Sequence, residues 1–145
     1  MAATVHRLGD DAGTGSAMKA INPLLAGVHI AAMGEALAFA ATQRLDLRRV
    51  VDVISGSAGT SWMFENRAPH VVDGDYTPRS AVNIWPKDLG IVSEIAARAD
   101  LPVPVTQAAL GQFRAAADVG DGGADAAALT RVSARAAGLT LPGDV

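Results

Sequence analysis

The chain contains no cysteine, which excludes a disulfide framework and thiolate metal sites and is compatible with a reducing cytoplasm. Aromatic residues make up only 4% of the 145 residues, although half of the chain is apolar. Alanine supplies much of that apolar share, and such a composition favours closely packed helices over a β-sandwich. The length fits one domain.

Charge is also sparse. The net charge is −3, and lysine and arginine are scattered without a basic stripe, so we expect no nucleic-acid binding. The first residues hold no apolar run followed by a cleavage site, which argues against a signal peptide. The one long apolar stretch, residues 20–41, contains Asn22, Pro23 and Glu35, each costly in lipid. It predicts a buried helix of a cytoplasmic protein and no membrane span.

Several sequence motifs of catalytic and metal sites are missing. There is no phosphate-binding loop, no nucleophile elbow and no His-Glu-x-x-His pattern. The three histidines, His6, His29 and His70, lack metal-ligand spacing, so we expect no metal. The glycines of residues 13–15 fail as a dinucleotide fingerprint, because the preceding strand, the third glycine and the later acidic residue are not supplied.

We predict an all-α domain of about six helices around one long central helix, with no strand. Residues 17–44 contain no cluster of turn residues and would form a helix roughly 40 Å long. Because this stretch is apolar on nearly every side, it must be covered on every side. A seam of small residues follows it at three- and four-residue spacing: Gly27, Ala31, Gly34 and Ala38. Another helix can approach there, either from the same chain or from a second subunit.

Capping and breaking residues predict the shorter helices. Asp46 and Asn83 are expected to cap two of them, the second with Pro86 in its first turn. Pro69 is expected to limit a third helix that begins near Ser61. The predicted helices cover about residues 47–55, 61–69, 83 to the Pro-rich break at 101–104, 105–118 and 125–137.

We expect a single domain over residues 1–145, with an ordered core from about residue 6 to residue 137. Residues 72–78 are dense in turn residues and are expected to be an irregular connection. The glycine-rich residues 120–123 are expected to be flexible, and residues 139–145 to be a frayed tail.

Lys19 is the only permanent charge between Asp11 and Glu35, and it follows the small-residue run 13–18. An ammonium in apolar, glycine-rich surroundings loses hydration and can then exchange protons near neutral pH. Asn22 lies three residues later, so on a helix the two side chains share one side and could hold a substrate oxygen while Lys19 moves a proton. The structural alternative is a lysine that extends to solvent near the start of a helix.

Pro23 leaves two local geometries open. If the helix is already formed, proline removes the hydrogen bond to the Lys19 carbonyl and kinks the helix there. Alternatively, Asn22 caps the helix and Pro23 is its first residue. In either case Lys19 lies at a backbone irregularity.

A second candidate, Lys87, stands near the start of the helix expected after Asn83, beside Asp88. An acidic residue is ordinary in a first turn, because it complements the helix dipole. Lys87 opposes that dipole, which carries a small penalty unless an anionic or polar group compensates. Its position therefore suggests a ligand contact.

Six short motifs occur in a fixed order: GTGSAMKAIN (13–22), GEA (34–36), SW (61–62), GDY (74–76), KDL (87–89) and GAD (123–125). In this order they resemble the C-terminal half of the β-hydroxyacid dehydrogenases, the family that includes 3-hydroxyisobutyrate dehydrogenase and tartronate semialdehyde reductase. Residues 58–67 and 74–80 are most similar to the branch containing L-threonate dehydrogenase. The resemblance covers about residues 6–135.

The resemblance implies the helical C-terminal domain of a 6-phosphogluconate dehydrogenase-like enzyme that uses NAD or NADP. It implies that Lys19 is the acid/base on the hydroxyl of a small hydroxyacid, that Asn22 contacts this substrate, and that Lys87 reaches the dinucleotide. It also implies a homo-oligomer formed through the long helix. Two prolines depart from the family pattern: Pro23 stands where members often carry the substrate-binding amide, and Pro86 is unusual beside the aromatic position.

Family enzymes begin with a Rossmann domain, and the sequence contains no segment with its features. We therefore expect no hydride transfer by this chain alone, only in combination with a separate cofactor domain. The second hypothesis is a non-catalytic helical module for oligomerisation or interaction, derived from such an enzyme. Activity with an added cofactor domain that depends on Lys19 would exclude the module.

Overall fold

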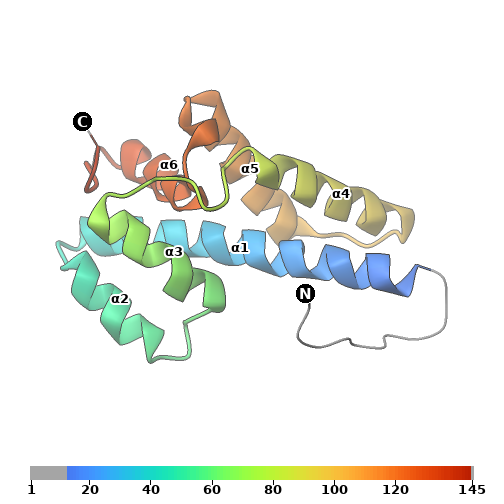
Figure 1. The fold of residues 1–145 in the computed structure, drawn as a ribbon, viewed down its shortest axis with the longest axis horizontal. Coiled ribbons are helices and arrows are strands. Elements are labelled where there is room, and N and C mark those ends of the chain that lie inside the picture. Colours follow the sequence, from blue (N-terminus) through green and yellow to red (C-terminus); the bar gives the residue numbers. More distant parts are fainter. Residues whose placement is uncertain (1–12, 145) are drawn as a thin grey trace.

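The computed structural model describes residues 13–144, so the predicted ordering of residues 6–12, His6 included, lies outside the described part. Within that part the chain forms helices and no strand, apart from one isolated bridge between Ala81 and Asp125. The all-α prediction is confirmed. The elements, shown in Figure 1, are α1 (Thr14–Thr42), α2 (Leu47–Ser55), α3 (Trp62–Asp73), α4 (Ile84–Arg98), α5 (Pro104–Asp118), the 3-10 helices η1 (Asp121–Gly123) and η2 (Ala126–Leu129), and α6 (Thr130–Ala136).

The long helix α1 is the central element, as predicted, and it contacts each of the other five α-helices. Ile30, Met33 and Leu37 of α1 are at most 2% exposed and form the middle of the hydrophobic core. By length and composition alone α1 could also cross a membrane. In this fold its middle and C-terminal half serve as the packing surface for the rest of the domain.

The seam of small residues on α1 is used within the chain. A Cβ on Gly27 would come within 2.9 Å of the Leu89 side chain of α4. One on Gly34 would come within 3.2 Å of the Thr130 backbone nitrogen, at the start of α6. Glycine at these two positions therefore lets neighbouring segments approach closely. At Gly27 and Gly34 the approach is therefore intramolecular, which is one of the two alternatives.

The predicted cap at Asp46 forms, Ser61 caps the helix predicted to begin near it, and one predicted breaker does not act. The Asp46 carboxylate accepts hydrogen bonds from the backbone of Arg48 and Arg49 at the start of α2. The Ser61 hydroxyl accepts one from Phe64 at the start of α3. The prediction that Pro69 limits α3 is wrong, because the helix continues past it to Asp73.

Packing and a glycine set the true end of α3. Ala68 and Val71, on either side of Pro69, are fully buried, so contacts with the core hold this turn helical despite the hydrogen bond that the proline lacks. Gly74 follows α3 with φ 65°, a left-handed conformation that glycine adopts at little cost.

Asn83 precedes α4 as predicted, but its side chain does not cap the helix. Its backbone N–H donates to the carbonyl of Gly122, and a Cβ on Gly122 would come within 2.5 Å of the Asn83 amide. The start of α4 is therefore held by the 120–125 segment through backbone contacts.

A buried cluster of Arg67, His70 and Asp125, the Asp125 cluster, joins three parts of the chain. The fully buried Asp125 carboxylate accepts backbone hydrogen bonds from Arg79, Ser80 and Ala127. It lies 3.7 Å from Arg67 Nε and 3.4 Å from His70 Nδ1, both on α3.

The segment after α6 is packed, so the expectation of a frayed tail is wrong for its described residues. Leu141 is only 3% exposed, and Arg131 of α6 forms an ion pair with Asp144 at 2.6 Å. The expectation that residues 120–123 are flexible is also wrong, because Asp121 in that segment pairs with Arg131 and Arg135. These ion pairs join the loop, α6 and the tail.

Tyr76, the single tyrosine of the chain, reports on this region. The Arg131 guanidinium lies 3.8 Å from its ring centroid, yet burial of the phenol outweighs that charge and raises its pKa above the ordinary 10.0. Since the folded pKa is raised, we expect the stability that the neutral phenol contributes to be fully present below about pH 10 and to be lost as the pH rises through the folded pKa. Tyrosinate absorbance during an alkaline titration should show a midpoint above 10. A midpoint at or below 10 would contradict the prediction, and the unfolded chain in denaturant is the control.

Candidate functional site

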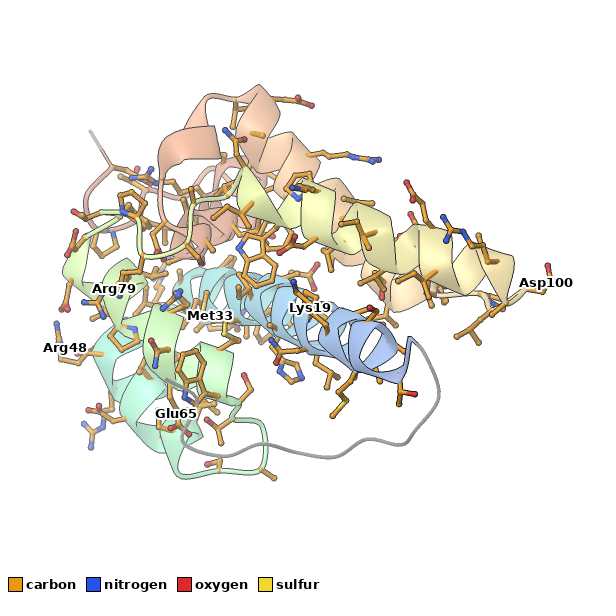
Figure 2. The ribbon with its side chains drawn as sticks, turned by 45° about the vertical axis from the view of Figure 1, so that its right-hand side comes forward. Lys19, Met33, Arg48, Glu65, Arg79 and Asp100 are labelled. Carbon is orange, nitrogen blue, oxygen red and sulfur yellow. The ribbon has the colours of Figure 1, made fainter. Side chains whose placement is uncertain are left out.

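Lys19 and Asn22 lie one helical turn apart in the N-terminal half of α1, where Figure 2 labels Lys19. The helix begins at Thr14, so Pro23 stands inside it and Asn22 is not its cap. This decides between the two geometries left open by the sequence. Since Pro23 has no N–H, the Lys19 carbonyl lacks its helical hydrogen bond, which leaves an acceptor beside the two candidate side chains.

Lys19 is exposed in this domain, as is Asn22. The loss of hydration expected from its apolar neighbours in the sequence therefore does not occur within the described chain. No ion pair to Lys19 forms within residues 13–144. An uncovered ammonium beside an amide can bind an oxygen-rich ligand.

Lys87 lies in the first turns of α4, with Pro86 directly before it, as predicted. Trp85 is 7% exposed and stacks on Phe113 of α5 with ring centroids 5.4 Å apart, which fixes this end of the helix. Lys87 itself is exposed and, like Lys19, has no ion-pair partner in the described part of the chain. Asp88 is partly buried beside it.

The contact between Gly27 and Leu89 relates the two lysines. Lys19 lies eight residues before Gly27, which is about 12 Å along α1. Lys87 lies two residues before Leu89, about 3 Å along α4. Because the two helices run in roughly opposite directions (Figure 1), these lengths add to about 15 Å along the helix pair. This separation of the two backbone positions suits an elongated ligand or two adjacent ligands.

The described residues bring together no metal site: no three His, Cys, Asp or Glu side chains converge between residues 13 and 144. The Asp125 cluster is the set of ionisable residues that the sequence did not predict. Its members are nearly inaccessible to solvent, and both His70 nitrogens lack a hydrogen-bond partner. No local pattern could have found it, because Asp125 follows His70 by 55 positions in the chain.

Comparison with known proteins gives consistent results. The profile of a family described as the NAD-binding domain of NADP-dependent 3-hydroxyisobutyrate dehydrogenase matches residues 13–133. The chain is 48% identical over 143 residues to L-threonate dehydrogenase from Escherichia coli (strain CFT073) and also 48% identical over 143 residues to that from Cupriavidus necator. Each match covers 99% of this chain, but only 46% and 47% of the respective relative.

A crystal structure of 3-hydroxyisobutyrate dehydrogenase from Salmonella typhimurium has the same fold over the matched part. It superposes with a TM-score of 0.87 and 50% sequence identity over 90% of this chain and 46% of that one. The chain therefore spans about half the length of the relatives that it matches.

Proposed function

Because this chain belongs to the 3-hydroxyisobutyrate dehydrogenase family, which contains NAD-binding enzymes, we propose that it is the helical catalytic half of a dehydrogenase for a small hydroxyacid. The observation that carries this proposal is the pairing of an exposed, unpaired Lys19 with Asn22 one turn later on α1. The similarity to L-threonate dehydrogenases makes L-threonate the first substrate to test.

In the proposed reaction, Lys19 acts as general base on the substrate hydroxyl. In its neutral form the Nζ takes the hydroxyl proton while the C–H bond of the same carbon breaks and the C=O bond forms. Asn22 and the free Lys19 carbonyl provide a donor and an acceptor that orient the hydroxyacid. For reduction the roles reverse, and the ammonium returns the proton to the oxygen.

NAD or NADP supplies the hydride acceptor when it is bound. Lys87 fits an anionic ligand of this kind, because it is exposed and has no ion-pair partner within residues 13–144. It also lies near the N-terminus of α4, where the helix dipole favours the binding of an anion. We propose that its ammonium holds the dinucleotide and that the neighbouring Asp88 orients it.

The partners follow from the same proposal. A cofactor domain covers the exposed face around Lys19 and removes its hydration, which the helical domain does not do. Copies of the chain associate through α1, on a face other than the filled seam at Gly27 and Gly34. We place the protein in the cytoplasm, without nucleic-acid or membrane partners.

The test combines this chain with the part of Escherichia coli L-threonate dehydrogenase that it does not match, supplied in fusion or as a separate protein. We expect NADH or NADPH formation from L-threonate only in the combination, and none with the chain alone. If the correctly folded combination binds the dinucleotide but shows no turnover with L-threonate or 3-hydroxyisobutyrate, the non-catalytic interaction module, which Pro23 and Pro86 favour, replaces the proposal.

Replacing Lys87 with alanine in the combined enzyme is expected to raise the KM for the dinucleotide about tenfold or more, because a charge-assisted contact is lost. The kcat should change little if the contact is equal in ground and transition states. Arg98→Ala is the matched control, since Arg98 is also an exposed cation on α4, in its last turn. Equal effects from both variants would contradict a specific role for Lys87.

A further inference from the structure

The loop at residues 121–125 is held at both ends by buried carboxylates, and we call it the anchored loop. At one end the Asp121 carboxylate lies 3.1 Å from Arg131 and 2.7 Å from Arg135, both on α6. At the other end Asp125 is fully buried in its cluster with two residues of α3. Charge-assisted hydrogen bonds are short and directional, so these contacts fix the loop relative to both helices.

The anchored loop supplies hydrogen-bond acceptors to the chain that enters α4. The N–H of Val82 donates to the Ala124 carbonyl over 2.9 Å. The N–H of Asn83 donates to the Gly122 carbonyl over 3.0 Å. The Val82 carbonyl in turn accepts a hydrogen bond from the N–H of Trp85 over 3.1 Å, so the first turn of α4 is built directly on the loop.

Two contacts hold opposite sides of this turn. Trp85 stacks on Phe113 of α5 and holds the side that faces the core. Residues two apart lie on nearly opposite sides of a helix, so Lys87 projects from the other side. Asn83, four residues before Lys87, lies on that same outer side and contacts the anchored loop.

Nothing local replaces the anchored loop at this end of α4. The Asn83 side chain does not cap the helix, and the first turn contains no acidic residue. The first N–H groups of a helix have no partner within it, and an end that is not held from outside frays. The outer side of the first turn, which carries Lys87, therefore depends on the loop.

Gly122 makes the close contact with Asn83 possible. A Cβ on Gly122 would lie 2.5 Å from Asn83 Oδ1 and 2.6 Å from its Nδ2, so that one of the two residues would have to shift. The backbone of Gly122 is not left-handed, so the approach of the amide, and not an unusual conformation, requires glycine here. The adjacent Gly123 has no atom within 4 Å of the equivalent point.

We propose that Gly122 is a positioning residue for Lys87. By admitting the Asn83 amide, it lets the anchored loop hold the side of α4 from which the ammonium reaches the dinucleotide. A group that is ordered before binding loses less conformational freedom on binding, which strengthens the affinity. This inference rests on the proposed role of Lys87 and adds a residue that acts on the cofactor without touching it.

In the combined enzyme, Gly122→Ala is expected to raise the KM for the dinucleotide about 2- to 10-fold, the range for ordering one long side chain. The kcat and the KM for the hydroxyacid should change little, because Lys87 contacts the cofactor only. Gly123→Ala is the matched control. It adds the same methyl group one residue later, where nothing lies within 4 Å, and should change none of the three parameters.

Hydrogen exchange of the isolated chain gives a readout that needs no activity. Exchange at residues 82–87 should become faster in Gly122→Ala and stay unchanged in Gly123→Ala, because only the first substitution disturbs the contact that holds this turn. Circular dichroism should show both variants folded.

Two double variants test the route of the effect. Asn83→Ala in the Gly122→Ala background removes the amide that the new methyl group meets, so the KM for the dinucleotide should fall again. Gly122→Ala added to Lys87→Ala should raise this KM no further, because the group that Gly122 positions is already absent.

The inference is overturned if Gly122→Ala leaves either the KM for the dinucleotide or the exchange at residues 82–87 unchanged, or if Gly123→Ala has the same effects. It is also overturned if Asn83→Ala does not restore the KM, or if the effects of Gly122→Ala and Lys87→Ala multiply. In each of these cases Lys87→Ala alone still raises the KM, and the proposed function stands. If Lys87→Ala itself has no effect, the proposed role of Lys87 fails and this inference fails with it.

Discussion

Replacing Lys19 with alanine is expected to lower the kcat of the combined enzyme about 10²- to 10⁴-fold, the range for loss of a positioned general acid or base. The KM for the hydroxyacid should change much less, because Asn22 and the Lys19 carbonyl remain. Steady-state kinetics with L-threonate at several pH values measures both parameters.

Lys19→Arg separates proton transfer from simple charge. Arginine keeps the positive charge but does not release its proton in this pH range, so it should be nearly as inactive as alanine. If Lys19→Arg retains most of the activity, Lys19 acts only as a cation and the proposed proton transfer is wrong. Because Lys19 is exposed, the isolated domain should fold equally well with either substitution, which circular dichroism can check.

Replacing Asp125 with alanine is expected to cost the domain about 3–5 kcal/mol of its free energy of unfolding, as for other buried ion pairs that lose one partner. Arg67, 7% exposed, then remains buried without a counter-charge. The backbone N–H groups of Arg79, Ser80 and Ala127 lose their acceptor as well. Both losses leave polar groups unsatisfied in the core, which is why the effect exceeds that of an ordinary surface substitution.

Thermal and urea unfolding of the isolated chain measures this effect, with a fall in Tm of roughly 10–20 °C. Asp73→Ala is the matched control, because Asp73 pairs with Arg48 at 2.6 Å but both side chains are more than half exposed. The loss of unfolding free energy in Asp73→Ala should be too small to resolve by unfolding measurements. Similar stability of both variants would show that the Asp125 cluster contributes no more than a surface ion pair.

Local signals in the sequence predicted much of this fold. Asp46 predicted the start of α2, because a capping carboxylate acts on backbone groups two and three residues away. The composition and length of the 17–44 stretch likewise predicted a central helix, because apolar character and the absence of turn residues are properties of the stretch itself. Lys19, Asn22 and Lys87 were found from local context together with the resemblance.

Features that depend on distant residues could not be predicted. Pro69 was expected to limit α3, but contacts of its neighbours with other helices decide the outcome. Leu141 is buried in a segment whose Gly143 lies against Gly74, and the sequence near residue 141 does not reveal this contact with a distant part of the chain. The sequence left open whether Lys19 is desolvated or extends to solvent, since this depends on which neighbours a folded domain places over one face of α1.

The contact between Gly34 and Thr130 has a consequence for synthesis of the protein. Thr130 follows Gly34 by 96 positions (130 − 34), so a ribosome that adds about 5–20 residues per second needs roughly 5–20 s between making the two. During this interval the most apolar helix of the chain has emerged, while the segment that closes over its glycine has not yet been made. A nascent chain of this kind should bind chaperones that recognise exposed apolar helices, and it should release them only when α6 leaves the ribosome.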